Sequence, residues 1–198
     1  MKYRVEPLAV ERLSKLDHQP RTEGVHLSQV IQYILRKLEP SRYGKDWSQL
    51  SDEERLRIEC GYLWEDLVFS PVMLDRIFPR DSDTVIRNLE LDEDSIYQTL
   101  DGFHVRRNRV IEVKYSGSNV ADPNDPKFKH WRWQNMAYCR TARTTRAVFI
   151  VLFHVGRGIR PFLPEAQLWW VRYTPAELEK NWHMIQTNRD EMLDSARG

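Results

Sequence analysis

A carboxylate and an ammonium group two residues apart are the first side chains here whose types and spacing could do chemistry. They are Glu112 and Lys114, in the β-prone run 109–115. Alternate side chains of a strand share a face, so Glu112 and Lys114 point one way while Ile111 and Val113 point the other. An isolated Glu-x-Lys pattern is most often an exposed strand edge over an apolar inner face, so the pattern alone does not define a site.

The preceding β-prone run supplies a second carboxylate. If residues 107–108 form the turn of a hairpin, Phe103 pairs with Glu112, and Asp101 pairs with Lys114. Cross-strand partners share a face, so Asp101, Glu112 and Lys114 then cluster. A turn one residue longer would break this arrangement, because a slip of one residue turns every side chain to the opposite face.

Two carboxylates beside one ammonium group suit metal-dependent cleavage of phosphodiester bonds. Hard oxygen ligands bind Mg²⁺ or Mn²⁺, and Mg²⁺ usually leaves several of its positions to water and substrate phosphate. A bound ion lowers the pKa of water and stabilises charge on the phosphate. Lys114 can orient that water or help deprotonate it, and it adds positive charge near the transition state.

A further carboxylate, Glu65, lies in a mostly apolar helical stretch. A glutamate beside another acid, here Asp66, is usually just solvated, so Glu65 alone carries little weight. Gln134 and Tyr138 are four residues apart and share one face of a predicted helix over 129–140. That region is basic and aromatic, with Lys127, Lys129, His130, Trp131, Arg132 and Trp133. Basic residues with interleaved rings suit a phosphate backbone and stackable bases, although the tryptophans are more often packing residues.

The elements that must position these residues follow from periodicity and turn chemistry. Residues 1–22 are predicted to be a loosely structured arm. The predicted helices cover 25–38, 51–68, 129–140 and a segment from Pro175 to about 193, with a break at Pro71. The predicted strands cover 84–91, 95–105, 109–115, 147–155 and 167–173, the first three as an antiparallel meander. This order predicts one mixed sheet with helices packed around it, an α/β (α+β) fold.

Composition narrows the class of protein. The 198 residues suffice for one domain with a real core, and no run approaches the roughly 18 to 20 apolar residues of a membrane span. The N-terminus does not read as a signal peptide, and Cys60 and Cys139 alone form no disulfide framework, so we expect a cytoplasmic protein with reduced thiols. Net charge is only +1, but residues 52–101 are mainly acidic and residues 106–160 mainly basic. That asymmetry fits either a nucleic-acid surface or a solvated face.

Together these residues resemble the PD-(D/E)XK nuclease superfamily, and within it the RecB-like and phage recombination exonuclease branch. The resemblance rests on the core order helix, three strands, helix, strand and on four short motifs: Glu65 with Gly61 one turn earlier, Asp101-Gly102, Glu112-Val113-Lys114, and Gln134 with Tyr138 as the Q-x-x-x-Y motif. The resemblance implies one nuclease domain over 1–198. Its restriction-endonuclease-like core would span about 51–155, flanked by an arm and helix over 1–50 and a strand and helix over 165–194.

The resemblance also implies roles. Metal ligands would be Glu65, Asp101, Glu112 and the backbone carbonyl of Val113, with Lys114 as the catalytic lysine. Gln134 and Tyr138 would bind DNA and order the site, next to Lys129 and Arg132 as further DNA-binding residues. The cofactor would be one or two Mg²⁺ or Mn²⁺ ions, and no iron–sulfur cluster is expected because its cysteine set is missing.

The implied activity is hydrolysis of DNA phosphodiester bonds, as an exonuclease of phage or mobile-element type acting in recombination, repair or degradation. The protein would act in the cytoplasm of a bacterial or phage-infected host cell and would not bind a membrane. A homo-oligomer and a recombination or annealing partner protein are both open. The alternatives are a structure- or site-specific endonuclease of the same fold and an inactive nucleic-acid-binding module.

Overall fold

A computed structural model describes residues 24–44, 50–117, 122–153 and 165–197, so the predicted arm lies outside the described residues. The helices are α1 (Leu27–Leu38), α2 (Pro40–Tyr43), α3 (Asp52–Val68), α4 (Pro71–Ile77), α5 (Lys129–Thr141) and α6 (Pro175–Ser195). The strands are β1 (Val25–His26), β2 (Val85–Glu93), β3 (Ile96–His104), β4 (Arg109–Ser116), β5 (Arg146–Phe153) and β6 (Glu165–Arg172). Short 3-10 turns cover Ser82–Thr84 and Pro126–Phe128.

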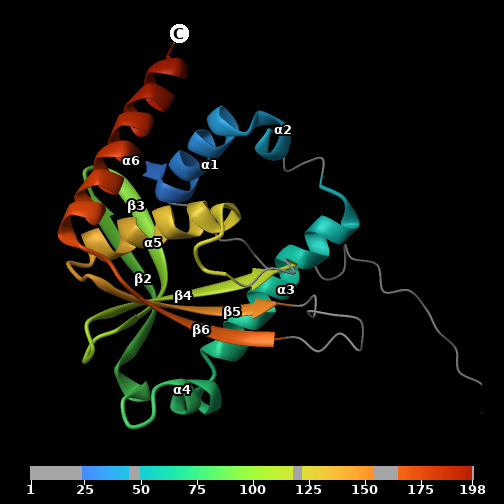
Figure 1. The fold of residues 1–198 in the computed structure, drawn as a ribbon, viewed down its shortest axis with the longest axis vertical. Helices are drawn as coiled ribbons and strands as arrows, with labels where there is room; N and C mark the ends of the chain where they lie inside the picture. Colours follow the sequence, from blue (N-terminus) through green and yellow to red (C-terminus); the bar gives the residue numbers. More distant parts are fainter. Residues whose placement is uncertain (1–23, 45–49, 118–121, 154–164, 198) are drawn as a thin grey trace, which may run out of the picture.

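These strands form one mixed six-stranded sheet (Figure 1). β2 and β3 are antiparallel, as are β3 and β4, so the predicted meander is confirmed. β4 and β5 run parallel, joined by α5, and β6 returns antiparallel at the edge. A parallel connection needs a crossover, and α5 provides it.

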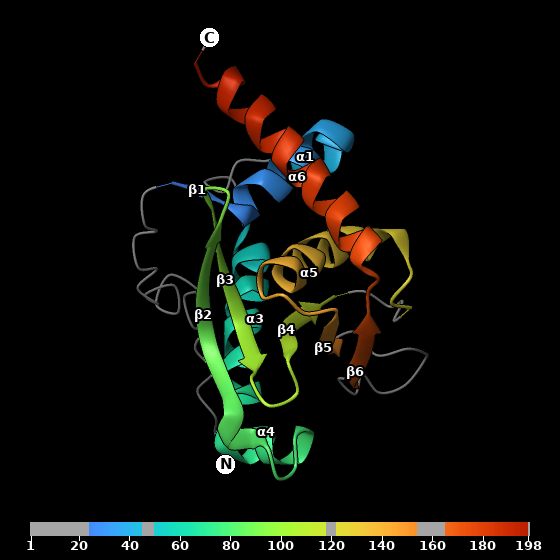
Figure 2. The same cartoon turned by 90° about the vertical axis from the view of Figure 1, so that its left-hand side faces the viewer.

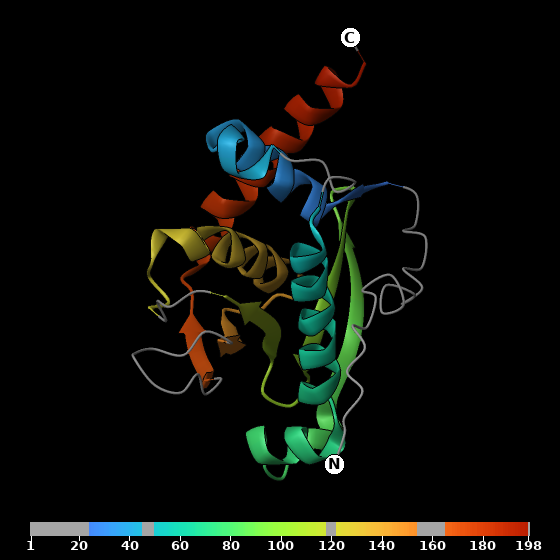
Figure 3. The same ribbon diagram turned by 90° about the vertical axis from the view of Figure 1, so that its right-hand side faces the viewer.

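Helices cover both faces of the sheet. On one face, α1, α5 and α6 share a core cluster that includes Val30, Val110 and Trp182. On the other face, Trp64 and Val68 of α3 pack against the β4 and β5 side chains, with Phe78 after α4. Figure 3 shows α3 and α5 on opposite sides of the strands. The predicted α/β arrangement of a mixed sheet between helices is therefore confirmed.

The starts of the two longest helices follow their local sequence. Ser51 caps α3, accepting a 3.2 Å hydrogen bond from the Glu54 backbone N–H while the Glu54 carboxylate accepts from the Ser51 N–H at 2.8 Å. Thr174 and Glu177 repeat the same capping box at α6. Each box satisfies backbone donors that the first helical turn cannot pair.

The long β2–β3 hairpin extends beyond the shorter strands towards α1 and α6 (Figure 2). β2 pairs with β3 along most of the length of both strands, so β2 occupies one edge of β3. The other edge is shared: β4 pairs only with residues 102–104, and β1 pairs in parallel with residues 96–97. Residues 98–101 of β3 therefore lie in a gap between β4 and β1.

The remaining differences from the sequence prediction are small. β1 and α2 were not predicted, because elements of two and four residues are too short to show periodicity. Both cysteines are free, Cys139 buried and Cys60 half-buried. Among the described helices, none is long and apolar enough to span a membrane.

Candidate active site

β4 presents Glu112 and Lys114 to the face covered by α5. Glu112 is 0% exposed, and its carboxylate forms an ion pair with the Lys114 ammonium group. The alternate residues Ile111 and Val113 pack with Trp64 on the α3 face. The alternation predicted for β4 is therefore present, but Glu112 is a core residue and not part of an exposed edge.

The register of the β3–β4 hairpin differs from the predicted one. Gly102 pairs with Ile111, and His104 with Arg109, so a four-residue loop over 105–108 replaces the predicted two-residue turn. In that loop the Asn108 backbone N–H donates to the Val105 carbonyl at 3.0 Å. The predicted pairs were wrong by two residues. Since side chains alternate with a period of two, the shift keeps Asp101 on the face of Glu112 and Lys114.

Asp101 lies where the strand pairing is interrupted. The β3–β4 pairing ends at Gly102, and the β2–β3 pairing skips the position of Asp101, opposite Asn88 with its positive φ of 53°. The Asp101 carboxylate instead accepts a 2.8 Å hydrogen bond from the Val113 backbone N–H. Gly102 is required next to it, because a Cβ there would lie 2.6 Å from the Phe69 ring.

Glu65 reaches this region from α3. Its carboxylate pairs with Arg87 of β2 at 3.3 Å, and Arg87 also pairs with Asp66. Burial raises the pKa of Glu65, and the nearby Asp101 carboxylate raises it further. Glu65 and Asp101 therefore lie close enough for their charges to interact.

Gln134 and Tyr138 approach from α5. The Gln134 Oε1 atom lies 3.5 Å from Lys114 Nζ, and the Gln134 Nε2 atom donates to the Tyr138 hydroxyl at 2.7 Å. Tyr138 is nearly fully buried. The structure thus brings together Glu65, Asp101, Glu112, Lys114, Gln134 and Tyr138, with Val113 bonded to Asp101.

The two basic residues predicted to bind DNA, Lys129 and Arg132, also make contacts within the chain. Lys129 forms a 2.5 Å ion pair with Glu39 at the end of α1. Arg132 donates to the backbone carbonyls of Pro123 at 2.5 Å and Asp125 at 3.3 Å, which holds the loop before α5. Neither residue contacts the carboxylates of Asp101 on β3 or Glu112 on β4.

Burial dominates the electrostatics of the cluster. It raises the pKa of Glu112 to about 8 against the opposing Lys114 ammonium, and the Asp101 carboxylate adds to the rise. Burial also raises the pKa of Asp101. For Lys114, burial lowers the pKa, but Glu112 and Asp101 outweigh it and the net pKa is raised. Lys114 is therefore a cation at neutral pH.

Two contributing residues were not predicted. Arg87 is an ordinary strand residue in the sequence, and only the packing of α3 beside β2 pairs it with Glu65. Asn135 follows Gln134 and is fully buried; its Oδ1 atom accepts from the Tyr173 hydroxyl at 3.0 Å, and its side chain lowers the pKa of Glu112. A buried asparagine in a polar helix has no distinguishing sequence signal.

The donor set suits a divalent cation, although it is not assembled as a finished metal site. Among the described residues, no three acidic, histidine or cysteine side chains lie close enough together to hold a metal ion. Both Glu112 carboxylate oxygens are buried without a hydrogen bond of regular geometry from the described residues. Burial of a carboxylate is costly unless a cation compensates it; Lys114 supplies one positive charge, and a bound metal ion would supply more. When fully ionised, four carboxylates (Glu65, Asp66, Asp101, Glu112) face two cations (Arg87, Lys114), an excess of two negative charges.

Comparisons with known proteins find structures of similar fold but no family of similar sequence. No known family profile and no curated protein sequence matches the chain. The crystal structure of a phage-related exonuclease from Haemophilus somnus 129PT matches with a TM-score of 0.52 at 12% identity, covering 86% of this chain and 83% of that chain. The crystal structure of SSO0001 matches with a TM-score of 0.47 at 12% identity, covering 90% and 83%. The chain is thus an α/β protein that shares its fold with a phage-related exonuclease.

Proposed function

We propose that this protein is a Mg²⁺- or Mn²⁺-dependent deoxyribonuclease of the PD-(D/E)XK type, acting as an exonuclease. The observation that carries the proposal is the buried Glu112 carboxylate, paired with Lys114 and next to Asp101. A protein core does not retain such a group for stability, because burial of a charge usually costs more than its pairing returns. The fold shared with a phage-related exonuclease supports the same class of activity.

The metal would be held by the carboxylates of Asp101 and Glu112, the backbone carbonyl of Val113 and, after release from Arg87, Glu65. When bound, the ion supplies a Lewis acid for water activation and for charge on the phosphate. Lys114 remains protonated, so it stabilises negative charge on the phosphate and orients the attacking water. Gln134 restrains the Lys114 ammonium group, and the Tyr138 hydroxyl restrains Gln134.

The test is cleavage of end-labelled single- and double-stranded DNA by the purified chain with Mg²⁺, with Mn²⁺ and with EDTA. Wild-type protein should release products with metal only, and Lys114→Ala and Glu112→Gln should release none while their circular dichroism spectra stay unchanged. Intact DNA with both metals would contradict the proposal. Closed circular DNA separates the two modes of cleavage: an exonuclease leaves it closed, whereas nicking would show an endonuclease.

A further inference from the structure

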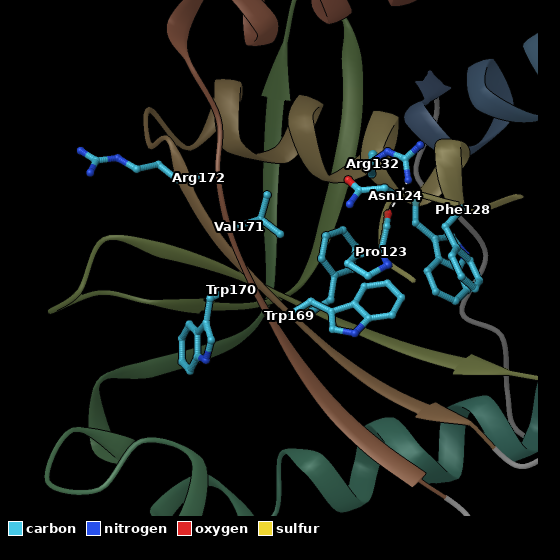
Figure 4. Close-up of a pocket in the computed structure, with 10 residues that line it drawn as sticks. Pro123, Asn124, Phe128, Arg132, Trp169, Trp170, Val171 and Arg172 are labelled. Atoms are coloured by element: carbon cyan, nitrogen blue, oxygen red, sulfur yellow. Dashed lines mark hydrogen bonds between the residues drawn. The ribbon is translucent and has the colours of Figure 1, made fainter. Parts of the chain in front are cut away.

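An aromatic cavity of about 230 Å³ lies between β6, the start of α5 and the loop before that helix (Figure 4). Phe128, Trp131, Phe149 and Trp169 line it. The Phe128 and Trp131 rings are stacked with centroids 4.4 Å apart, and Trp169 meets Phe128 at 5.6 Å and 60°. An apolar cavity of about 150 Å³ accommodates benzene. This cavity therefore has room for one planar ring system.

The cavity lies on the same face of the sheet as the candidate active site. Glu112 of β4 pairs with Phe149 of β5, and Phe149 pairs with Trp169 of β6. Register partners share a face, so these three side chains form a row across three strands. Adjacent strands are about 4.8 Å apart, which puts Trp169 about 10 Å from Glu112 along the row.

One guanidinium group lies at the cavity, that of Arg132 from α5. Arg172 of β6 also belongs to the lining, but its side chain points away from the aromatic rings (Figure 4). Within the described part of the chain, Arg132 forms no ion pair with a carboxylate, and it donates to the backbone carbonyls of the preceding loop. Aromatic walls beside a cation that no carboxylate neutralises fit a ligand with a flat π-face and an adjacent anion. A nucleotide has both features.

We infer that this cavity binds an unpaired nucleobase of the DNA substrate, stacked on Trp169 and Trp131, with its phosphate near Arg132. The inference rests on the proposed nuclease function and specifies its substrate: DNA with a single-stranded segment beside the phosphate to be cleaved. A base in a duplex is stacked and paired on both sides, so it cannot enter. Stacking on aromatic side chains accepts every base, so the site selects strandedness over sequence.

The first experiment measures binding of a fluorescein-labelled oligo(dT) and of a blunt duplex of equal length, by anisotropy in EDTA so that no cleavage occurs. Trp169→Ala should weaken binding of the single strand about tenfold and leave duplex binding within about twofold. Trp169→Phe should retain most of the affinity because it keeps a ring. Leu168→Ala is the matched control, since Leu168 lies on the same strand with its side chain on the opposite face, 41% exposed. Equal single-strand affinity for wild type and a folded Trp169→Ala would overturn the inference.

A second measurement needs no variant and so does not depend on the folding of Trp169→Ala. Wild-type protein is irradiated with single-stranded DNA carrying 5-iodo-2′-deoxyuridine, and the crosslinked peptide is identified by mass spectrometry. Crosslinks at Trp131 or Trp169 support the inference, and crosslinks elsewhere, or none, overturn it. Cleavage assays decide the proposed function separately: metal-dependent cleavage without these crosslinks refutes the cavity alone, while crosslinks without cleavage refute the nuclease alone.

Discussion

The Asp101 carboxylate accepts a 2.8 Å hydrogen bond from the Val113 backbone N–H, at the point where β3 and β4 stop pairing. One acidic side chain thus takes the place of a strand partner and stands beside the buried Glu112. Its bonding role and its charge can be separated by substitution, because asparagine keeps an acceptor oxygen and loses the charge.

We expect Asp101→Asn to fold with wild-type stability and to lose DNA cleavage by about 100-fold or more, as expected when one charged group is removed from an active site. Asp101→Ala should lose activity as well, but it should also lose about 1–3 kcal/mol of stability because the buried Val113 N–H is left without an acceptor. Urea unfolding and the cleavage rate measure the two effects. Equal stability of the two variants would mean that the hydrogen bond is unimportant.

Glu112 makes the stability of the metal-free protein depend on pH. Its pKa is raised to about 8 by burial, so the folded state holds a proton that the unfolded state releases near pH 4.5. The stability that the protonated Glu112 carboxyl contributes to the folded state is fully present below pH 4.5 and is lost as the pH rises through about 8. Between pH 7 and 8.5 in EDTA, the free energy of unfolding of wild-type protein should fall by at most about 1.4 kcal/mol per pH unit. Glu112→Gln should give a flatter profile, and identical profiles would refute the assignment.

Gln134 should matter for turnover more than for binding, since it contacts Lys114 and Tyr138 inside the site. Gln134→Leu should lower kcat by about tenfold with little change in KM, the size expected for residues that orient a catalytic group. Tyr138→Phe should have a smaller effect, because the Gln134 amide keeps its contact with Lys114. A larger loss for Tyr138→Phe than for Gln134→Leu would contradict this order of contacts.

Gly102 leaves room for the Phe69 ring, which a Cβ would approach to 2.6 Å. Gly102→Ala should therefore destabilise the protein by about 1–3 kcal/mol, the usual cost of overpacking. In the Phe69→Ala background the same substitution should cost less, which a double-mutant cycle of unfolding free energies measures. Additive effects of the two substitutions would show that the contact is not the cause.

Arg87 and a metal ion compete for Glu65 under the proposed function. Arg87→Gln should tighten Mn²⁺ binding by up to about fivefold, because it frees Glu65 and removes one positive charge from the cluster. Isothermal titration calorimetry with Mn²⁺ measures the change. Arg57→Gln is the control, since Arg57 pairs with Glu53 on the exposed start of α3. Weaker Mn²⁺ binding in Arg87→Gln alone would mean that Arg87 helps to position Glu65.

Most elements of the fold were predictable because their signals are local. The helix over 51–68, the helix start at Pro175 and the alternation in β4 all depend on residues within a few positions of one another. Asp101, Glu112 and Lys114 were correctly placed on one face even though the predicted register was wrong. The loop over 105–108 was misjudged because Arg107-Asn108 alone resembles a short turn.

The rest depends on contacts between distant segments. Arg87 meets Glu65 only because α3 lies beside β2, and Asn135 lies near Glu112 only because α5 crosses the sheet. The row of Glu112, Phe149 and Trp169 requires the registers of two strand pairs, one of them parallel. None of these relationships has a spacing in the sequence that would reveal it.

The alternation of β4 also limits which insertions and deletions the hairpin can tolerate during evolution. A change that slides β4 by two residues along its neighbours alters the reach of Glu112 and Lys114 but leaves them on the same face. A slide of one residue would exchange them for Ile111 and Val113, placing charges against Trp64 and apolar groups in the site. In homologues of this chain, insertions and deletions in the 105–108 loop should therefore be those that shift the β3–β4 register by an even number of residues.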